Sequence, residues 1–236
     1  MVTTKRQNLI LEKIIEEYIG SAKPISSQLL EKRYDFGVCP ATIRIEMQKL
    51  TDEGFLYQPH TSAGRVPTDR AYRFFVDKLF EEGLPDLKEN LRLGDWLEGE
   101  IEDSLKFIQT ITKNLALASS NLALSYLFNE KIFWKEGWEE ILQEPEFQKT
   151  DFISSFTKLL KNFEKELEGL KLDSGIKVYI GKENPFSRAR DFSIIISQCH
   201  FAEEEKGIIS LLGPKRMAYD KNIALINSFK NILERL

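Results

Sequence analysis

The residues best suited to chemistry lie on one short segment, 40–50. Ile43, Met47 and Leu50 follow a helical spacing and predict an apolar stripe that packs inward. Successive residues of a helix turn by about 100°, so the remaining side chains are expected to point outward. A helix whose outer face carries small, amide and cationic side chains can enter the major groove of DNA. The predicted outward set is Ala41, Thr42, Arg44, Ile45, Gln48 and Lys49.

A second polar segment follows directly, and its composition is that of a rigid loop. Gly54 ends the preceding helix, and Phe55-Leu56-Tyr57 has the character of a short strand. Pro59 and Pro67 then bracket a polar stretch that carries one arginine. This pattern is typical of the wing that accompanies a helix-turn-helix. The candidate nucleic-acid contacts in the loop are His60, Thr61, Ser62 and Arg65.

The outward residues of segment 40–50 differ in the contacts that their chemistry allows. Arg44 is the leading candidate for a base or phosphate contact, although an arginine on a helix flank also commonly serves as a surface ion-pair partner. Gln48 can reach base edges or remain solvated. Thr42 and Lys49 are better suited to phosphate oxygens.

Three basic residues outside this segment leave more than one role open. Arg65 is expected at the tip of the loop, where it suits a phosphate contact or insertion into the minor groove. His60 can contact a phosphate or act as a structural hydrogen-bond donor that pins the loop. Arg73 either meets a backbone phosphate or braces the loop, and its position in the sequence does not distinguish these roles.

Composition places the chain among soluble globular proteins. Its 236 residues are 30% charged and 42% hydrophobic, which suits two domains with real cores. No apolar run approaches the about eighteen residues of a membrane span, and the first residues lack the apolar segment of a signal peptide. We therefore expect a cytoplasmic protein without a membrane segment. Cys39 and Cys199 do not make a disulfide framework.

The net charge of −4 argues against a polyanion held by bulk electrostatics. Residues 1–80 carry twelve Lys or Arg against ten Asp or Glu, whereas the remaining residues carry 21 against 27. An excess of two positive charges over residues 1–80 is too small to form a basic arm of the kind that binds DNA through charge alone. DNA binding would therefore rest on individually placed contacts, and its affinity would still fall as salt rises.

The elements that would position these residues form a predicted domain over 1–83. Cys39 stands where the N-cap of segment 40–50 belongs, and a thiol caps poorly, so this helix should start more weakly by about 1 kcal/mol. Gly83-Leu84-Pro85 marks the domain boundary. The predicted helices span residues 5–20, a stretch capped by Ser26 or Ser27 and ending near 33, residues 40–53, and residues from Thr68 to about 83.

The remaining residues, 84–236, predict a second domain with a small antiparallel sheet. Residues 121–128 can form a buried strand or a continued helix, because periodicity alone does not separate the two. The C-terminal order of helix, three strands and helix suggests helices on one side of the sheet. Trp134 and Trp138 are expected in the core. The other predicted elements are a mostly helical stretch over 88–120, helices over 151–170 and 222–236, and strands over 176–180, 192–199 and 207–212.

Two strings in the first domain carry a family resemblance. The first is ATIRxEM, and the second is EGFLYQPHTSAGRVPTDxxYRFFVD, in which the run QPHTSAGR is long and has a low chance likelihood. Together they identify a resemblance to the heat-inducible transcription repressor family, HrcA. The resemblance is dense over residues 5–83 and looser over 130–236.

The resemblance implies an α+β fold with an N-terminal winged helix-turn-helix domain, 1–83, and a reduced GAF-like regulatory or dimerisation domain, 84–236. It implies a DNA-binding repressor of heat-shock (chaperone) genes. Such a repressor acts as a homodimer on an inverted-repeat operator in double-stranded DNA. It further implies the chaperonin GroEL-GroES as a partner that modulates activity. Neither a cofactor nor a metal is expected.

The chain departs from the family in two places. Similar proteins carry further strands and an inserted dimerisation domain between the segments corresponding to NLALSYLF and KIFWKEGWEEIL, which only Asn129-Glu130 separates here. A dimer interface would then come from residues 88–120 or from an exposed strand. Ile45 stands where the family typically has asparagine. Asparagine can grip adenine, whereas isoleucine can touch only a thymine methyl, so the operator is expected to differ.

The alternative to this reading is a ligand-sensing winged-helix regulator. Residues 182–184 and 213–217 could line a polar pocket in the GAF-like domain. An enzyme is not expected, because the sequence holds no G-x-S-x-G, P-loop or catalytic cysteine–histidine set. Cys199-His200 lacks further metal ligands at a suitable spacing. Cys39 could act as a redox sensor, but a drifted serine is the favoured interpretation.

Overall fold

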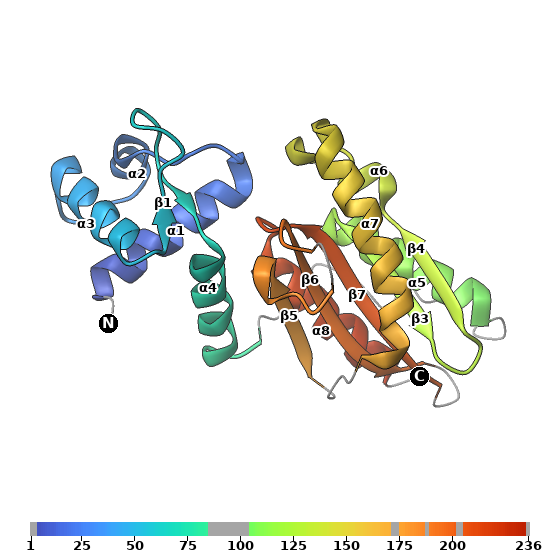
Figure 1. The fold of residues 1–236 in the computed structure, drawn as a ribbon. Coiled ribbons are helices and arrows are strands. Elements are labelled where there is room, and N and C mark those ends of the chain that lie inside the picture. Colours follow the sequence, from blue (N-terminus) through green and yellow to red (C-terminus); the bar gives the residue numbers. More distant parts are fainter. Residues whose placement is uncertain (1–3, 85–103, 171–174, 187–188, 202–204, 235–236) are drawn as a thin grey trace. The chain divides into compact units, whose positions relative to one another are not determined.

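The structure is a computed structural model that describes residues 4–84, 104–170, 175–186, 189–201 and 205–234. Its contacts divide the chain into two compact units, Met1–Glu81 and Glu82–Leu236. Figure 1 shows that helices dominate the first unit and that a sheet forms the centre of the second. The chain is therefore a mixed helix-and-sheet protein of the α+β class, as its sequence predicted.

Three helices form the body of the first unit, and local capping explains where two of them begin. They are α1 (Lys5–Ser21), α2 (Ser27–Arg33) and α3 (Pro40–Asp52). The side chains of Thr4 and Gln7 form a capping box at the start of α1, and the Ser26 hydroxyl accepts from the Leu29 N–H at the start of α2. The fully buried apolar residues of these helices are Ile10, Leu11, Ile14, Ile15, Leu30, Ile43 and Leu50.

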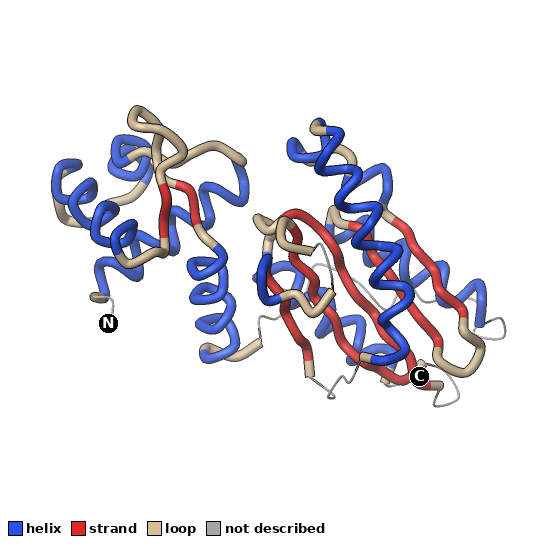
Figure 2. Tube along the Cα trace, in the orientation of Figure 1, coloured by secondary structure: helices blue, strands red, loops and turns tan. Residues whose placement is uncertain are grey.

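A small antiparallel pair of strands and a fourth helix complete the first unit. In β1 (Leu56–Tyr57) and β2 (Val66–Pro67), Leu56 lies opposite Pro67. Thr68 then donates its hydroxyl to the Gly54 carbonyl and accepts from the Ala71 N–H, which fixes the entry into α4 (Asp69–Glu81). The loop that joins the two strands (Figure 2) begins and ends at the paired residues Tyr57 and Val66.

The second unit is built on a five-stranded sheet in which every neighbouring pair is antiparallel. The strand order is β4-β3-β7-β6-β5, so β4 and β5, which follow one another in the chain, lie at the two edges. The strands are β3 (Leu122–Leu127), β4 (Ile132–Glu136), β5 (Ile176–Ile180), β6 (Phe192–His200) and β7 (Lys206–Pro214).

Helices cover both faces of this sheet, which corrects the expectation of helices on one side. On one face, α7 (Thr150–Glu166) packs its buried side chains against β3, β6 and β7. On the other face, α5 (Ser104–Ser119) and α8 (Tyr219–Leu233) lie against the strands and each other. Figure 1 shows α7 in front of the sheet and α5 and α8 behind it. The three central strands, β3, β7 and β6, are thus covered on both faces. Every residue of β3 is accordingly buried.

The structure settles several other expectations about the second unit. Of residues 121–128, Leu122–Leu127 form a strand, and Ile132–Glu136, which was not predicted as a strand, pairs with it. Trp138 is 40% exposed and Trp134 is half-buried, so the expectation that both lie in the core was wrong. Of the predicted helical stretch 88–120, residues 88–103 lie outside the described residues. The short helices of this unit are α6 (Trp138–Ile141), η2 (Pro145–Gln148), η3 (Leu167–Gly169) and η4 (Gly181–Glu183).

Candidate nucleic-acid interface

The outer face of α3 carries the side chains that the sequence placed there. Ile43 and Leu50 are fully buried and Met47 nearly so, which turns the opposite face of the helix to solvent. Ile45 is 56% exposed, a large value for an isoleucine. The predicted outward residues Ala41, Arg44, Ile45, Gln48 and Lys49 are exposed, and Thr42 is half-buried.

The two cationic side chains on the outer face of α3, Arg44 and Lys49, differ in whether they pair with another residue of the chain. Lys49 Nζ lies 3.0 Å from the Glu46 carboxylate, one turn back along the helix. Arg44 has no hydrogen bond or ion pair with any residue that the structure describes. The guanidinium N–H groups of Arg44 are therefore available to an external acceptor, whereas the charge of Lys49 is partly neutralised by Glu46.

Arg44 borders a polar hollow of about 370 Å³ on the first unit. The start of α2, the outer part of α3 and the loop of residues 58–65 line it. Ser26, Thr61 and Ser62 supply hydroxyls to its wall, and Gln58 supplies an amide. Of the predicted site residues, the hollow brings together Arg44, Thr61, Ser62 and Arg65.

Residues 58–65, which we call the loop, are shaped by their own hydrogen bonds. Gln58 Nε2 donates to the carbonyl oxygens of Thr61 at 2.9 Å and of Ala63 at 2.8 Å. His60 Nδ1 lies 3.2 Å from Ser62 Oγ, and the Ala63 N–H donates to the His60 carbonyl. Sequence reasoning passed over Gln58, although an amide beside a proline in a polar loop is a recognisable donor to nearby carbonyls.

The loop is also fastened to the segment before α2. The Ile25 N–H donates to the Arg65 carbonyl at 2.9 Å, and the Arg65 N–H donates to the Ile25 carbonyl at 2.8 Å. A Cβ on Gly64 would lie 2.3 Å from the Ile25 oxygen, closer than real contacts allow. Only glycine therefore fits at position 64 of the QPHTSAGR run.

Arg65 does not lie at the tip of the loop, which corrects its predicted location. It directly precedes β2, and its side chain turns back onto α3. Its Nε donates to Thr51 Oγ1 at 3.0 Å, and its Nη2 donates to Gln48 Oε1 at 2.7 Å. Arg65 consequently joins the loop to the outer face of α3 and keeps the rest of its N–H groups for other acceptors.

Arg73 belongs to a different element from the other candidates. It lies on α4, is half-buried, and places Nη1 3.3 Å from the Asp77 carboxylate one turn along. A second arginine of this helix, Arg70, donates to the Glu53 carbonyl at 2.6 Å and lies over the Phe55 ring. Sequence reasoning did not single out Arg70, whose contacts fasten α4 to the end of α3.

Cys39 occupies the N-cap of α3 but does not cap it. Its backbone is extended, as an N-cap requires, yet its side chain makes no capping hydrogen bond to the helix backbone. Its sulfur instead lies 3.4 Å from Thr42 Oγ1. This side-chain hydrogen bond from Thr42 lowers the pKa of the Cys39 thiol below its ordinary value.

In the second unit, two loops were predicted as possible walls of a ligand pocket, residues 182–184 and 213–217. Asn184 and Arg216 of these loops form hydrogen bonds within the protein. Asn184 Nδ2 donates to the carbonyls of Gly181, Ala189 and Phe192 and closes its own loop. Arg216, only 8% exposed, donates to Glu146 through two nitrogens and also pairs with Glu144. Hydrogen bonds within the protein take up the Asn184 amide nitrogen and the Arg216 guanidinium, which favours a structural role for both loops, although the buried Asn184 Oδ1 has no hydrogen-bond partner among the described residues.

The part of the chain that the structure describes holds neither a metal-binding group nor a membrane-spanning helix. No group of three or more His, Cys, Asp or Glu residues is arranged to hold a metal ion there. Across the same residues, no helix is both long enough and apolar enough to cross a membrane.

Comparison with known families decides the relationship. A family model described as the HrcA protein C terminal domain matches residues 64–223, which is more than half of the chain. The chain belongs to the HrcA family. Its HrcA relatives include the heat-inducible transcription repressor HrcA of Thermodesulfovibrio yellowstonii, 28% identical over 98% of this chain and 97% of the relative. The repressor of the same name from Natranaerobius thermophilus is 27% identical over 97% of this chain and 95% of the relative.

The HrcA relatives contain residues for which this chain has no counterpart. The alignment with the Thermodesulfovibrio protein runs over 337 positions, whereas this chain has 236 residues. Among solved structures, a crystal structure described as a hypothetical protein aligns with a TM-score of 0.84. It is 20% identical and covers 99% of this chain and 98% of its own, so it supports the fold alone.

Proposed function

We propose that this HrcA-family chain is a transcription repressor that binds double-stranded DNA through α3 and the loop. The three helices and the β1–β2 pair suit a winged helix-turn-helix, in which the third helix enters the major groove. The observation that carries the proposal is Arg44, which is exposed, unpartnered among the described residues, and beside the hollow between helix and loop. A guanidinium so placed can bind a phosphate or the O6 and N7 of guanine.

The neighbouring residues divide the remaining contacts. Ile45 has only an apolar surface to offer and suits a thymine methyl group, whereas Gln48 suits a base edge. Hydroxyls and cations at the margin of the surface suit phosphates, which fix the register of the protein on the duplex. The proposed contact set is Ala41, Thr42, Arg44, Ile45, Gln48, Lys49, His60, Thr61, Ser62, Arg65 and Arg73.

The second unit is proposed to be a reduced GAF-like domain that pairs two copies of the chain. Two recognition helices would then enter successive major grooves of an inverted repeat, about one helical turn apart. The edge strand β4, whose five residues are all half-buried, supplies part of the proposed pairing surface. Sedimentation at micromolar concentration should therefore show a dimer, and a stable monomer with and without DNA would contradict the paired arrangement.

The regulated genes are proposed to be heat-shock genes, and the site of action the cytoplasm. The heat-shock role is supported by the names of the HrcA relatives, which are heat-inducible transcription repressors. Modulation by the chaperonin GroEL-GroES is proposed from the family resemblance. Purified chaperonin should raise the fraction of chain that binds the operator, and an unchanged fraction would remove the chaperonin from the proposal.

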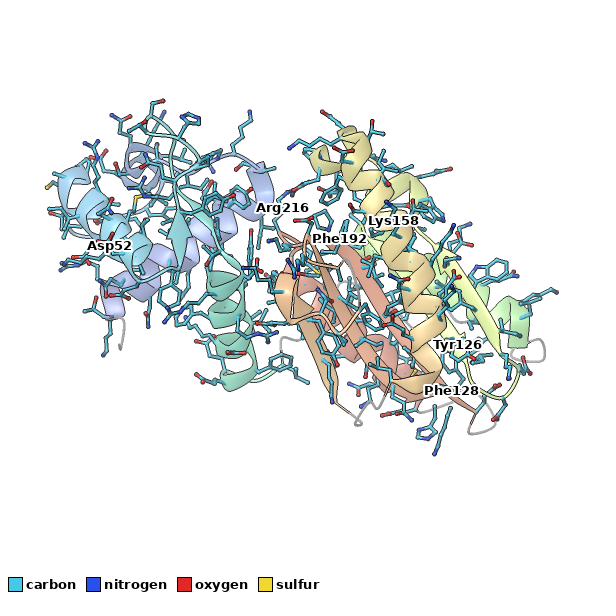
Figure 3. All side chains as sticks on the ribbon, in the orientation of Figure 1. Asp52, Tyr126, Phe128, Lys158, Phe192 and Arg216 are labelled. Atoms are coloured by element: carbon cyan, nitrogen blue, oxygen red, sulfur yellow. The ribbon has the colours of Figure 1, made fainter. Side chains whose placement is uncertain are left out.

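Selection from a pool of random duplexes, followed by titration, tests DNA binding. The full chain should enrich an inverted repeat, and Arg44→Ala should weaken binding to that duplex about tenfold, or about 1.4 kcal/mol. Its melting temperature should not change, because Arg44 makes no hydrogen bond or ion pair with any described residue. Lys158→Ala removes the same charge from an exposed position on α7 and should leave the affinity unchanged (Figure 3). A pool without enriched sequences would contradict the proposal.

A further inference from the structure

A chain of three side chains crosses the outer face of the first unit from the loop to the end of α3. Arg65 Nη2 donates to Gln48 Oε1 at 2.7 Å, and Gln48 Nε2 donates to Asp52 Oδ1 at 2.8 Å. Asp52 lies at the C-terminal end of α3 and is labelled in Figure 3. Gln48 therefore has a partner on each side of its amide although it remains exposed.

The chemistry of the two partners permits only one orientation of this amide. A guanidinium can only donate hydrogen bonds, so it must face the amide oxygen of Gln48. An ionised carboxylate can only accept, so Asp52 must face the amide nitrogen. Rotating the amide by 180° would set the Arg65 donors against N–H groups and the Asp52 oxygen against the Gln48 oxygen. The oxygen and nitrogen of Gln48 are thus fixed in space, which a solvated glutamine amide would not be.

Arg65 is itself well anchored, so it can hold the amide. Its backbone pairs with Ile25, and its Nε donates to Thr51 Oγ1 at 3.0 Å. Thr51 directs its own hydroxyl hydrogen to the Met47 carbonyl at 2.8 Å, which leaves a lone pair for Arg65. The close approach of Gly64 to Ile25 sets the position from which the Arg65 side chain starts. The conformation of the loop is thereby transmitted to Gln48.

The amide keeps one free group of each kind. An amide oxygen has two lone pairs and an amide nitrogen has two hydrogens, and the contacts with Arg65 and Asp52 use one of each. One acceptor and one donor remain. Adenine presents a donor at N6 and an acceptor at N7 in the major groove, which matches this pair, whereas guanine presents acceptors at both O6 and N7.

We infer that Arg65 and Asp52 hold the Gln48 amide in the one orientation that recognises adenine, so that the loop sets base specificity without touching that base. The inference rests on the proposed DNA binding and names its substrate, an operator half-site with an A·T pair under Gln48. Arg65 and Asp52 are positioning residues in this arrangement. Ile45, one turn before Gln48 on the same face, places a thymine methyl contact beside that pair.

The test measures discrimination between bases, which a merely structural surface contact would not change. The full chain is titrated with the selected duplex and with versions carrying each other base pair at every half-site position. Gln48→Ala identifies the position that Gln48 reads as the one where preference is lost. At that position the unaltered chain should prefer A·T over G·C by about tenfold or more.

Two variants then remove the constraint on the amide while Gln48 stays in place. Asp52→Asn replaces the carboxylate with an amide, which can either donate to Gln48 or accept from it. Arg65→Lys keeps the positive charge but replaces the guanidinium, which donates to both Thr51 and Gln48, with a single ammonium group. Both should reduce the A·T preference at that one position at least about threefold and leave the preferences elsewhere unchanged. Glu53→Gln makes the same charge change as Asp52→Asn on the next residue and should keep the preference.

The outcomes separate this inference from the proposed function. If the unaltered chain binds no duplex, the proposed function fails and the inference fails with it. If the chain binds its operator but Asp52→Asn and Arg65→Lys keep the full A·T preference, the inference is overturned and DNA binding stands. A preference for a base other than adenine at the Gln48 position would overturn it equally.

Discussion

Arginines in the two units of this chain are used in opposite ways. Arg216 of the second unit is 8% exposed, and Glu144 and Glu146 occupy its guanidinium. Arg44 of the first unit is exposed and has no partner among the described residues, and Arg65 is bonded on one side only of its guanidinium. The buried pairing holds two loops together, whereas the open arrangement keeps donors for an outside partner. Charge alone therefore does not mark a binding surface; unused hydrogen-bonding capacity does.

The same contrast separates the polar loops of the two units. Asn184 donates to three carbonyls of its own loop, while the loop of residues 58–65 closes on itself through Gln58 and still turns hydroxyls toward a hollow. The first unit is thus rigid where it is exposed, which lowers the conformational entropy lost on binding. Four substitutions test how far this contrast holds.

Arg216→Ala should have the largest effect, on stability. It leaves Glu144 and Glu146 without their partner at a site where the arginine is buried, and removing one member of a buried pair costs about 3 kcal/mol or more. The glutamates keep 27% and 24% exposure, so the loss should lie at the lower end of this range. Denaturant unfolding measures it.

Lys135→Ala is the matched control for that loss. Lys135 pairs with Glu164, and both side chains are about one-third exposed. Surface pairs contribute about 0–1 kcal/mol, so this variant should unfold close to the parent midpoint. Equal losses in both variants would erase the distinction between a buried and an exposed pair.

Gly64→Ala should destabilise the first unit by about 1–3 kcal/mol. The added methyl group would lie 2.3 Å from the Ile25 carbonyl oxygen, and a backbone atom cannot move away cheaply. Because the loop would shift, Arg65 should also lose its contact with Gln48. Thermal unfolding and operator titration both report the change.

Gly20→Ala serves as the control for this substitution. A Cβ at Gly20, inside α1, meets nothing within 4 Å among the atoms around it. Alanine is favoured over glycine in a helix by up to about 1 kcal/mol, so this variant should be slightly more stable. Equal destabilisation by both alanines would show that position 64 has no special steric constraint.

Ile45→Asn should change which operator the chain prefers, by about 1–2 kcal/mol at one base pair. The isoleucine is 56% exposed on the face of α3 that we propose to contact DNA, and asparagine can bond to adenine where isoleucine offers only apolar contact. Selection from random duplexes with parent and variant compares the two. An identical sequence profile would reject the role assigned to this position.

Cys39→Ser should have the smallest effect, a gain of about 1 kcal/mol in stability. A serine hydroxyl can accept a capping hydrogen bond from a backbone N–H of the first turn of α3, and the Cys39 side chain makes no such bond. Thermal unfolding measures the gain. Ser26→Ala, which removes a cap that is present at α2, should lose a similar amount. A lower melting temperature for Cys39→Ser would show that the Thr42 contact matters more than capping.

The sequence predicted local features well and contacts between distant segments poorly. The helical spacing of Ile43, Met47 and Leu50 was enough to find α3 and its outer face, because a period of 3.6 residues is a local property. The predicted location of Arg65 was wrong because its side chain is held by hydrogen bonds to Gln48 and Thr51, which lie seventeen and fourteen residues earlier in the chain. The specific contact of Gln48 could not be foreseen for the same reason.

The second unit shows the same limit on a larger scale. Helices 151–170 and 222–236 were evident from their apolar periodicity, but nothing in the spacing says which face of the sheet each covers. Strand β4 was not predicted because its sequence, IFWKE, lacks the alternation of apolar and polar residues that indicates a strand. All of its residues are half-buried, and Lys135-Glu136 places two charges at its end. Edge strands commonly carry such charges.

Hydroxyl-radical footprinting of the full chain, free and bound to its selected duplex, tests the central claim most directly. The method reports the solvent access of individual side chains. Ile45 on α3 and His60 in the loop are exposed in the free chain and should become protected on binding, while the exposed Trp138 of the second unit should react as before. Unchanged reactivity of Ile45 and His60 in a chain that has bound the duplex would contradict the account.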